Sequence, residues 1–140
     1  MGKVKVAVAT KGSKGFGDEV SDFFAKAETF TLATIEGKRA HIEVIKNPAA
    51  NLPCGRGRAV VQMLKDNSVD TVVASELGLG SSALLEHYKI NQIVVKAGTR
   101  VGDVIRDKLY KKRRVIHIAM FEIACILLLS GIAFRLIILA

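Results

Sequence analysis

The chain has 140 residues, half of them apolar, and a formal net charge of +8. This length fits one domain of ordinary size and excludes a large multidomain enzyme, and the apolar content excludes a disordered chain. Two cysteines, Cys54 and Cys125, are too few for a disulfide framework and are typical of a reducing compartment.

Three strands are predicted in the first half of the chain. Alternating apolar residues over 3–10 are typical of a strand, and the glycine-rich stretch 11–18 predicts a flexible loop. A short helical turn is expected over 20–26. Branched residues predict two further strands over 29–36 and 39–46, joined as a hairpin through Gly37. Residues 47–53, which hold both prolines, are expected to form a loop.

Helices and short buried strands alternate in the second half. A helix is predicted over 55–67 from the spacing of four residues, which are Gly57, Val60, Val61 and Leu64. Apolar runs predict buried strands over 69–75 and 92–97. Residues 78–82 are expected to be a loop before a second helix marked by Ser81, Leu84, Leu85 and Tyr88. Thr99 is expected to cap a third helix, which is lined by Val101, Val104, Ile105 and Leu109.

The predicted order is therefore βββαβαβα. A hairpin followed by strand–helix units predicts an α/β fold with a mixed five-stranded sheet and helices on both faces. Right-handed crossovers would make the first, fourth and fifth strands parallel. We expect this domain to span residues 1–110.

The excess charge lies mostly in a short segment near the C-terminus. Residues 1–107 carry a net charge of +3, and residues 108–114 carry +5. The tail that follows, 115–140, has 21 apolar residues out of 26. This distribution predicts a basic junction over 111–114, made of Lys111, Lys112, Arg113 and Arg114. The charge thus indicates a junction rather than a basic face, and a nucleic-acid partner is not expected.

Three interpretations of the tail stay open. A helix over 118–140 would be about 34 Å long, enough to span a bilayer, and the junction before it obeys the positive-inside rule. Glu122 and Arg135 would be costly in that position, so a helix in an oligomer interface and a strand joining the sheet are the alternatives. The N-terminus lacks the layout of a signal peptide, which predicts a cytoplasmic domain, anchored at its C-terminus if the tail spans a membrane.

Several short strings along residues 3–110 resemble the dinitrogenase iron-molybdenum cofactor family. They are Val20-Ser21 followed by Phe24 and Ala27, then Asn47-Pro48, Gly55-Arg56-Gly57, Val69-Asp70-Thr71-Val72-Val73, Leu77-Gly78 and Gly98-Thr99. The resemblance implies a three-layer ribonuclease-H-like fold. It also implies an accessory protein that binds an iron-sulfur or iron-molybdenum cluster and works with cofactor-assembly proteins.

The chain departs from the family at four positions in two of these strings. The family often reads Val-Ser-x-His-Phe-Gly-Arg-Ala, and Phe23 replaces the histidine, while Ala25 and Lys26 replace the glycine and arginine. Cys54 stands where a histidine is common before the Gly-x-Gly string. These replacements remove one candidate ligand and introduce another.

Cys54 is the candidate metal ligand. It precedes a predicted helix start, where free N–H groups and the helix dipole favour an anion, and a thiolate there could bind soft iron or copper. A single cysteine does not complete a metal site, so other ligands would be needed. The alternative is a loop cysteine with no role.

Two glycine-rich loops are candidates for binding the rest of a cluster. One follows the first strand and the other the fourth, and the carboxyl ends of parallel strands form the usual ligand crevice of an α/β sheet. Free amides there suit an anionic cluster or a phosphate. The candidate cofactor-binding residues are Cys54, Gly55, Gly57, Lys11, Gly12, Glu76 and Gly78. The alternative is that these glycines serve only tight turns.

No catalytic constellation is evident, and we do not expect an enzyme. His41, His87 and His117 show no ligand spacing, and the first strand contains no acid for a two-metal nuclease site. Three functions follow: a metal-cluster carrier, a module that binds anionic ligands, nucleic acid or lipid surfaces through its basic junction, and a structural domain that assembles through its tail.

Overall fold

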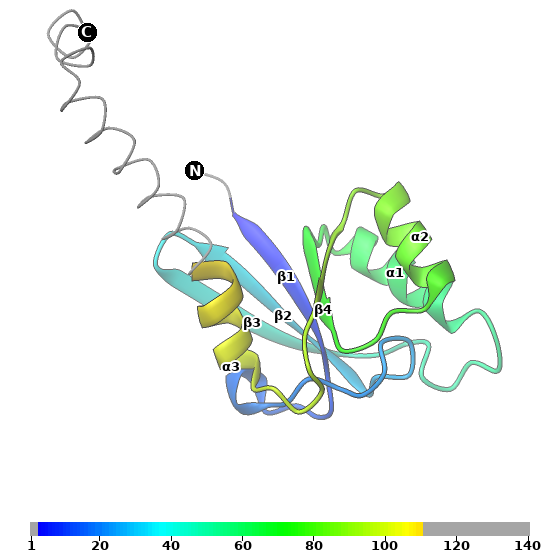
Figure 1. Cartoon of the computed structure of the whole chain (residues 1–140), viewed down its shortest axis with the longest axis horizontal. Coiled ribbons are helices and arrows are strands. Elements are labelled where there is room, and N and C mark those ends of the chain that lie inside the picture. Colours follow the sequence, from blue (N-terminus) through cyan, green and yellow to red (C-terminus); the bar gives the residue numbers. More distant parts are fainter. Residues whose placement is uncertain (1–2, 111–140) are drawn as a thin grey trace, which may run out of the picture. The chain divides into compact units, whose positions relative to one another are not determined.

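A computed structural model describes residues 3–110 and builds them around one five-stranded sheet (Figure 1). The elements are β1 (Val4–Thr10), a 3-10 turn η1 (Gly15–Gly17), β2 (Thr29–Glu36), β3 (Arg39–Lys46), α1 (Arg56–Asp66), β4 (Thr71–Ala74), α2 (Leu79–His87), β5 (Asn91–Val94), α3 (Val101–Val104) and a π-helix η2 (Ile105–Tyr110). The chain divides into two compact units, Met1–Asp103 and Val104–Ala140. All five strands belong to the first unit.

The strand order in the sheet is β3-β2-β1-β4-β5. β1 pairs antiparallel with β2 and parallel with β4, and β4 pairs parallel with β5. The predicted mixed sheet is therefore confirmed, including the parallel first, fourth and fifth strands. The hairpin between β2 and β3 is confirmed too, and Gly37 adopts the positive φ of 59° that such a turn needs.

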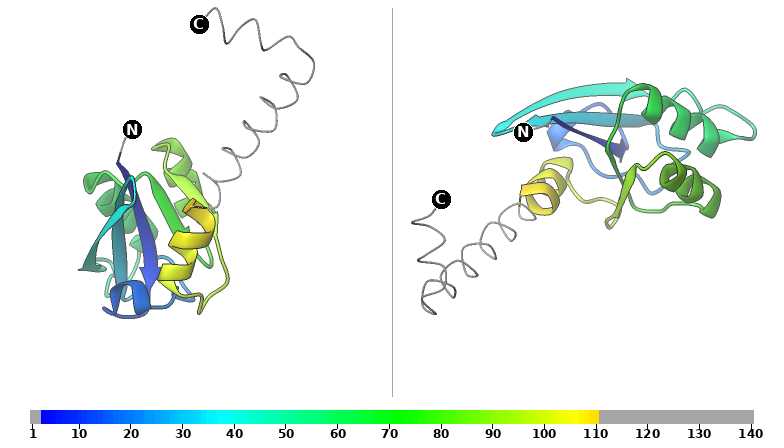
Figure 2. Two further views of the ribbon diagram at one scale, coloured as in Figure 1. Left: turned by 90° about the vertical axis from the view of Figure 1, so that its left-hand side faces the viewer. Right: turned by 90° about the horizontal axis from the view of Figure 1, so that it is seen from above.

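The centre of the sheet is buried on both faces, so β1 alternates between two packed surfaces. Ala7 and Ala9 share a cluster with residues of β2, α1 and α2, and Figures 1 and 2 show α1 and α2 together over this face. Val6 and Val8 point to the opposite face and are fully buried. Burial of each valine or leucine side chain contributes about 1.5–3 kcal/mol, which makes this two-faced packing the main stabilising term.

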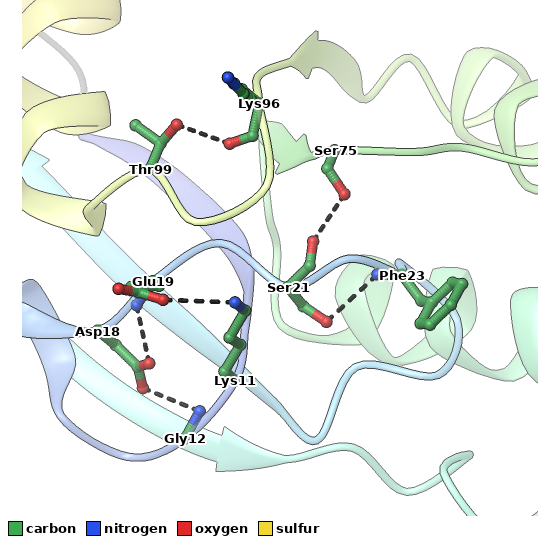
Figure 3. Close-up of polar contacts among 9 residues, drawn as sticks. All are labelled: Lys11, Gly12, Asp18, Glu19, Ser21, Phe23, Ser75, Lys96 and Thr99. Carbon is green, nitrogen blue, oxygen red and sulfur yellow. Dashed lines mark hydrogen bonds and ion pairs between the residues drawn. The ribbon is translucent and has the colours of Figure 1, made fainter.

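Three local predictions differ from the structure, each for a physical reason. The helical turn expected over 20–26 is reduced to one hydrogen-bonded turn from Phe24 to Ala27, because the backbone of Val20 bonds to Thr99 and Gly98 instead. α2 begins at Leu79, inside the predicted loop 78–82, with Gly78 as its N-cap. Thr99 does not cap its helix with its hydroxyl, which donates to the Lys96 carbonyl at 2.6 Å (Figure 3).

The junction and the tail lie outside the described residues. The predicted domain end at residue 110 coincides with the last described residue and stays a prediction. Between residues 3 and 110, no helix combines the length and the apolar content needed to cross a bilayer.

Candidate functional site

An open hollow of about 240 Å³ lies where β4 ends and two helices begin. Its lining comes from the segment 23–26, the first turn of α1, the loop after β4 and the start of α2. The residues are Phe23, Phe24, Ala25, Lys26, Gly57, Glu76, Gly78 and Ser81. Three of the predicted site residues, Gly57, Glu76 and Gly78, thus come together from segments about 20 residues apart in sequence.

The first turns of α1 and α2 approach closely beside this hollow. A β-carbon at Gly57 would collide with the Ser81 hydroxyl unless that side chain rotated, so glycine at this position lets the two helices lie close without rearrangement. The N-cap residues are Gly55 and Gly78, neither helix has a side-chain cap, and neither has an acidic residue in its first turn. Two helix N-termini without anionic caps therefore leave partial positive charge at one place.

The segment 21–27, one wall of the hollow, is held by side-chain hydrogen bonds from Ser75 and from the buried Asn47. The Ser75 hydroxyl, directly after β4, donates to the Ser21 carbonyl at 2.7 Å (Figure 3) and to the Asp22 carbonyl at 3.0 Å. The buried Asn47 side chain donates to the carbonyls of Ala25 at 3.0 Å and Ala27 at 2.7 Å. Phe24 below them packs edge-to-face on Phe30, with 5.7 Å between ring centroids. The wall is therefore a fixed surface.

Phe23 stands on this wall where the family often has a histidine. Its ring is 52% exposed and lies 5.7 Å from the Lys26 ammonium, a cation–π arrangement. The wall therefore contributes an aromatic face and a cation rather than a nitrogen ligand.

Cys54 and Gly55 lead into α1, and Cys54 is an exposed free thiol three residues before Gly57. Arg56, the first residue of α1, has its Nε shielded from solvent with no hydrogen-bond partner among the described residues. The start of α1 thus adds one thiol and one guanidinium to the region of the helix N-termini.

Lys11 and Gly12 lie elsewhere, in a loop that is closed by its own carboxylate (Figure 3). Asp18 is 4% exposed and accepts hydrogen bonds from the amides of Gly12 at 3.0 Å, Lys14 at 3.1 Å and Glu19 at 2.8 Å. The Lys11 ammonium pairs with Glu19 at 3.3 Å. The amides expected to bind an external anion therefore already hold an internal one.

The remaining candidates do not join the hollow. His41 lies on β3 and His87 ends α2, and within residues 3–110 no group of three or more His, Cys, Asp or Glu side chains could hold a metal ion. His117 and the junction, Lys111, Lys112, Arg113 and Arg114, lie outside the described residues, and a role for the junction at membranes or anionic surfaces stays a prediction.

These features define a small α/β domain with an open, amide-rich hollow at the carboxyl end of its sheet. The chain belongs to the dinitrogenase iron-molybdenum cofactor family, whose model matches residues 2–110. No curated protein matches the sequence.

Three solved structures are similar to the chain. The apo form of the orange protein from Desulfovibrio gigas is 20% identical with a TM-score of 0.69, and covers 76% of this chain and 88% of its own. PH0822 is 24% identical with a TM-score of 0.63, covering 75% and 89%. A candidate NifB protein from Thermotoga, assigned to the DUF35 family, is 26% identical with a TM-score of 0.61, covering 75% and 86%. The fold implied by the resemblance is therefore confirmed.

Sequence reasoning missed part of the lining, namely Phe24, Ala25, Lys26 and Ser81. It also missed the positioning role of Asn47 and Ser75. Asn47 and Phe24 stand within the strings that carried the family resemblance, so that signal was present without its geometric meaning. Ser75 lay in the glycine-rich loop after the fourth strand, but nothing in the sequence indicated its contact with Ser21.

Proposed function

We propose that this protein is a non-catalytic accessory carrier that binds an anionic metal cluster, of the iron-sulfur or iron-molybdenum type, in the hollow between α1 and α2. The cluster is its cargo, and cofactor-assembly proteins are the partners that supply or receive it. The observation that carries this proposal is the meeting of two helix N-termini without side-chain caps at one open hollow. Membership of the cofactor family supports the choice of ligand.

The charges around the hollow favour an anion. Lys26 lines it, and Arg56 and Arg58 occupy the first turn of α1. Glu76 is the single acidic residue of the lining. Backbone N–H groups at helix starts donate to anions, and the sulfides of a cluster accept such hydrogen bonds. The site can therefore hold a preformed anionic cluster without neutralising it completely.

The protein ligands in this region are few. Cys54 is the one thiol among residues 3–110, and Phe23 supplies no ligand atom where the family often has histidine. Clusters that stay in a protein are usually held by several thiolates. A single thiolate supported by backbone amides suits temporary binding. The cluster then keeps ligands from other sources and leaves when a partner protein offers more thiolate ligands.

Anaerobic reconstitution of the full-length chain with iron and sulfide tests this proposal. We expect visible absorbance that survives desalting and falls at least about fivefold in Cys54→Ser, because the thiolate is the strongest ligand in the region. Cys125→Ser is the matched control, since it removes the other cysteine, and it should retain the absorbance.

Two results would contradict the proposal. Reconstitution without a protein-bound chromophore would exclude an iron-sulfide cargo. A chromophore that persists in Cys54→Ser and disappears in Cys125→Ser would assign the cluster to another part of the chain.

A further inference from the structure

Among residues 3–110, β3 is an edge strand with no further strand paired to its outer side. It is the last strand of the sheet order, and Figure 2 shows it outermost. None of its eight residues is buried. It contains no proline, and its register against β2 is continuous from Glu36↔Arg39 to Thr29↔Lys46. An edge of this length without a bulge is a template for a further strand.

The hairpin determines which backbone groups face outward. In a two-residue hairpin the residues that flank the turn, here Glu36 and Arg39, exchange both backbone hydrogen bonds, and bonded and non-bonded pairs then alternate. The free N–H and C=O groups of β3 therefore belong to the even-numbered residues from Ala40 to Lys46. A second strand can pair only in registers that place even-numbered residues opposite one another.

We propose that β3 pairs antiparallel with β3 of a second copy of this chain, about a two-fold axis at His41. In this register Arg39 lies opposite Glu43 of the second copy, and by symmetry Glu43 lies opposite its Arg39. Ala40 and Ile42 exchange the central hydrogen bonds. Opposite charges at facing positions stabilise an antiparallel pair, and every such contact occurs twice.

The neighbouring registers are poorer. An axis at Ile42 separates Arg39 from Glu43, and an axis at Glu43 makes that carboxylate face its own copy. Among these three registers, the one at His41 is the one that places Arg39 opposite Glu43, and it pairs residues 39–43 of the two copies. The contact between Arg39 and Glu43 is therefore the one to test.

Charge exchange in the full-length chain tests this register. Arg39→Glu should weaken the dimer about tenfold or more, measured by sedimentation velocity, because two attractive pairs become repulsive. The double variant Arg39→Glu/Glu43→Arg should return to within about threefold of the parent, since each pair is restored with its signs exchanged. Lys89→Glu makes the same charge change at an exposed position outside β3 and should have no effect.

Cysteine pairing tests the axis independently. In a chain with Cys54→Ser and Cys125→Ser, His41→Cys should form an intermolecular disulfide, because facing Cα atoms of a non-bonded pair lie about 4.5 Å apart. Glu43→Cys is the control, since the two Cα atoms at position 43 would be about 13 Å apart along the strands. A monomer at every concentration tested, an oligomer unaffected by Arg39→Glu, or equal crosslinking of the two cysteines would overturn the proposal.

Discussion

Two glycine-rich regions near the carboxyl ends of β1 and β4 look alike in sequence and differ in structure. The loop after β1 folds around the buried Asp18 carboxylate, which takes the amides of Gly12, Lys14 and Glu19. The loop after β4 leads to a helix start at Gly78 with no side-chain cap, beside the equally uncapped start of α1. One region contains its own anion, and the other leaves room for an external one.

The comparison teaches that glycine and free amides do not by themselves identify an anion site. The deciding feature is whether a carboxylate of the same chain reaches those amides. Asp18 does so in the first region, while Glu76 in the second lines the hollow without capping either helix start. This comparison can be tested by substitutions that add or remove a ligand in either region, or that measure how much a contact contributes to stability.

Removal of the internal anion should have the largest effect on stability. Asp18→Ala deletes three hydrogen bonds to a buried carboxylate and should lower the free energy of unfolding by about 2–3 kcal/mol, measured by chemical denaturation. Asp18→Asn, which keeps an acceptor, should lose about half as much. Inorganic phosphate should stabilise Asp18→Ala more than the parent, because the released amides can bind it. Equal stabilisation of both would show that Asp18 does not occupy an anion site.

Restoring a ligand to the hollow should strengthen metal binding. Phe23→His introduces an imidazole on the exposed wall and should slow iron loss from the reconstituted protein about tenfold, measured by transfer to a chelator. Phe23→Leu removes the aromatic ring without adding a ligand and serves as the control. If both variants release iron at the parent rate, the wall does not contact the cluster.

A single methyl group added between the first turns of α1 and α2 should lower the stability of the protein. Gly57→Ala should lower the free energy of unfolding by about 1 kcal/mol despite the better helix propensity of alanine, because the new carbon meets the Ser81 hydroxyl. Gly57→Ala/Ser81→Ala should recover that loss, and Ser81→Ala alone is the reference. A stabilised Gly57→Ala would contradict the described contact.

The exposed ion pair in the loop after β1 should contribute least to the free energy of unfolding. Lys11 and Glu19 are both about half exposed, and solvent screens their interaction. Lys11→Ala should therefore change the free energy of unfolding by no more than about 0.5 kcal/mol. A loss comparable with that of Asp18→Ala would mean that the pair, rather than the buried carboxylate, holds the loop.

The order and type of the main elements could be predicted from the sequence, because they depend on local periodicity. The spacing of Val60, Val61 and Leu64 in α1 matches the buried face of that helix, whereas β1 shows the strand period but is buried on both faces. The start of α2 was missed because its first residue, Leu79, is 93% exposed and breaks the apolar pattern of a packed helix.

The candidate site could be predicted only in part. Gly57, Glu76 and Gly78 line one hollow, as parallel strands that bring their carboxyl ends together lead one to expect, and their role in binding stays a prediction. Lys11 and Gly12 were grouped with them because nothing local shows that Asp18, predicted as the end of a flexible loop, turns inward. That fact depends on long-range contacts, including the amide of Val101 bonded to the Asp18 carbonyl at 2.9 Å.

The most direct test of the account is where a bound cluster lies. In the ¹⁵N-labelled full-length chain, reconstituted with iron and sulfide, a paramagnetic cluster broadens the amide signals nearest to it. We predict selective loss of signals from Gly55 to Arg58 and from Gly78 to Ser81, with those of Gly12 and Lys14 retained. Loss of the Gly12 and Lys14 signals with those of the helix starts unchanged would contradict the assignment of the hollow as the binding site.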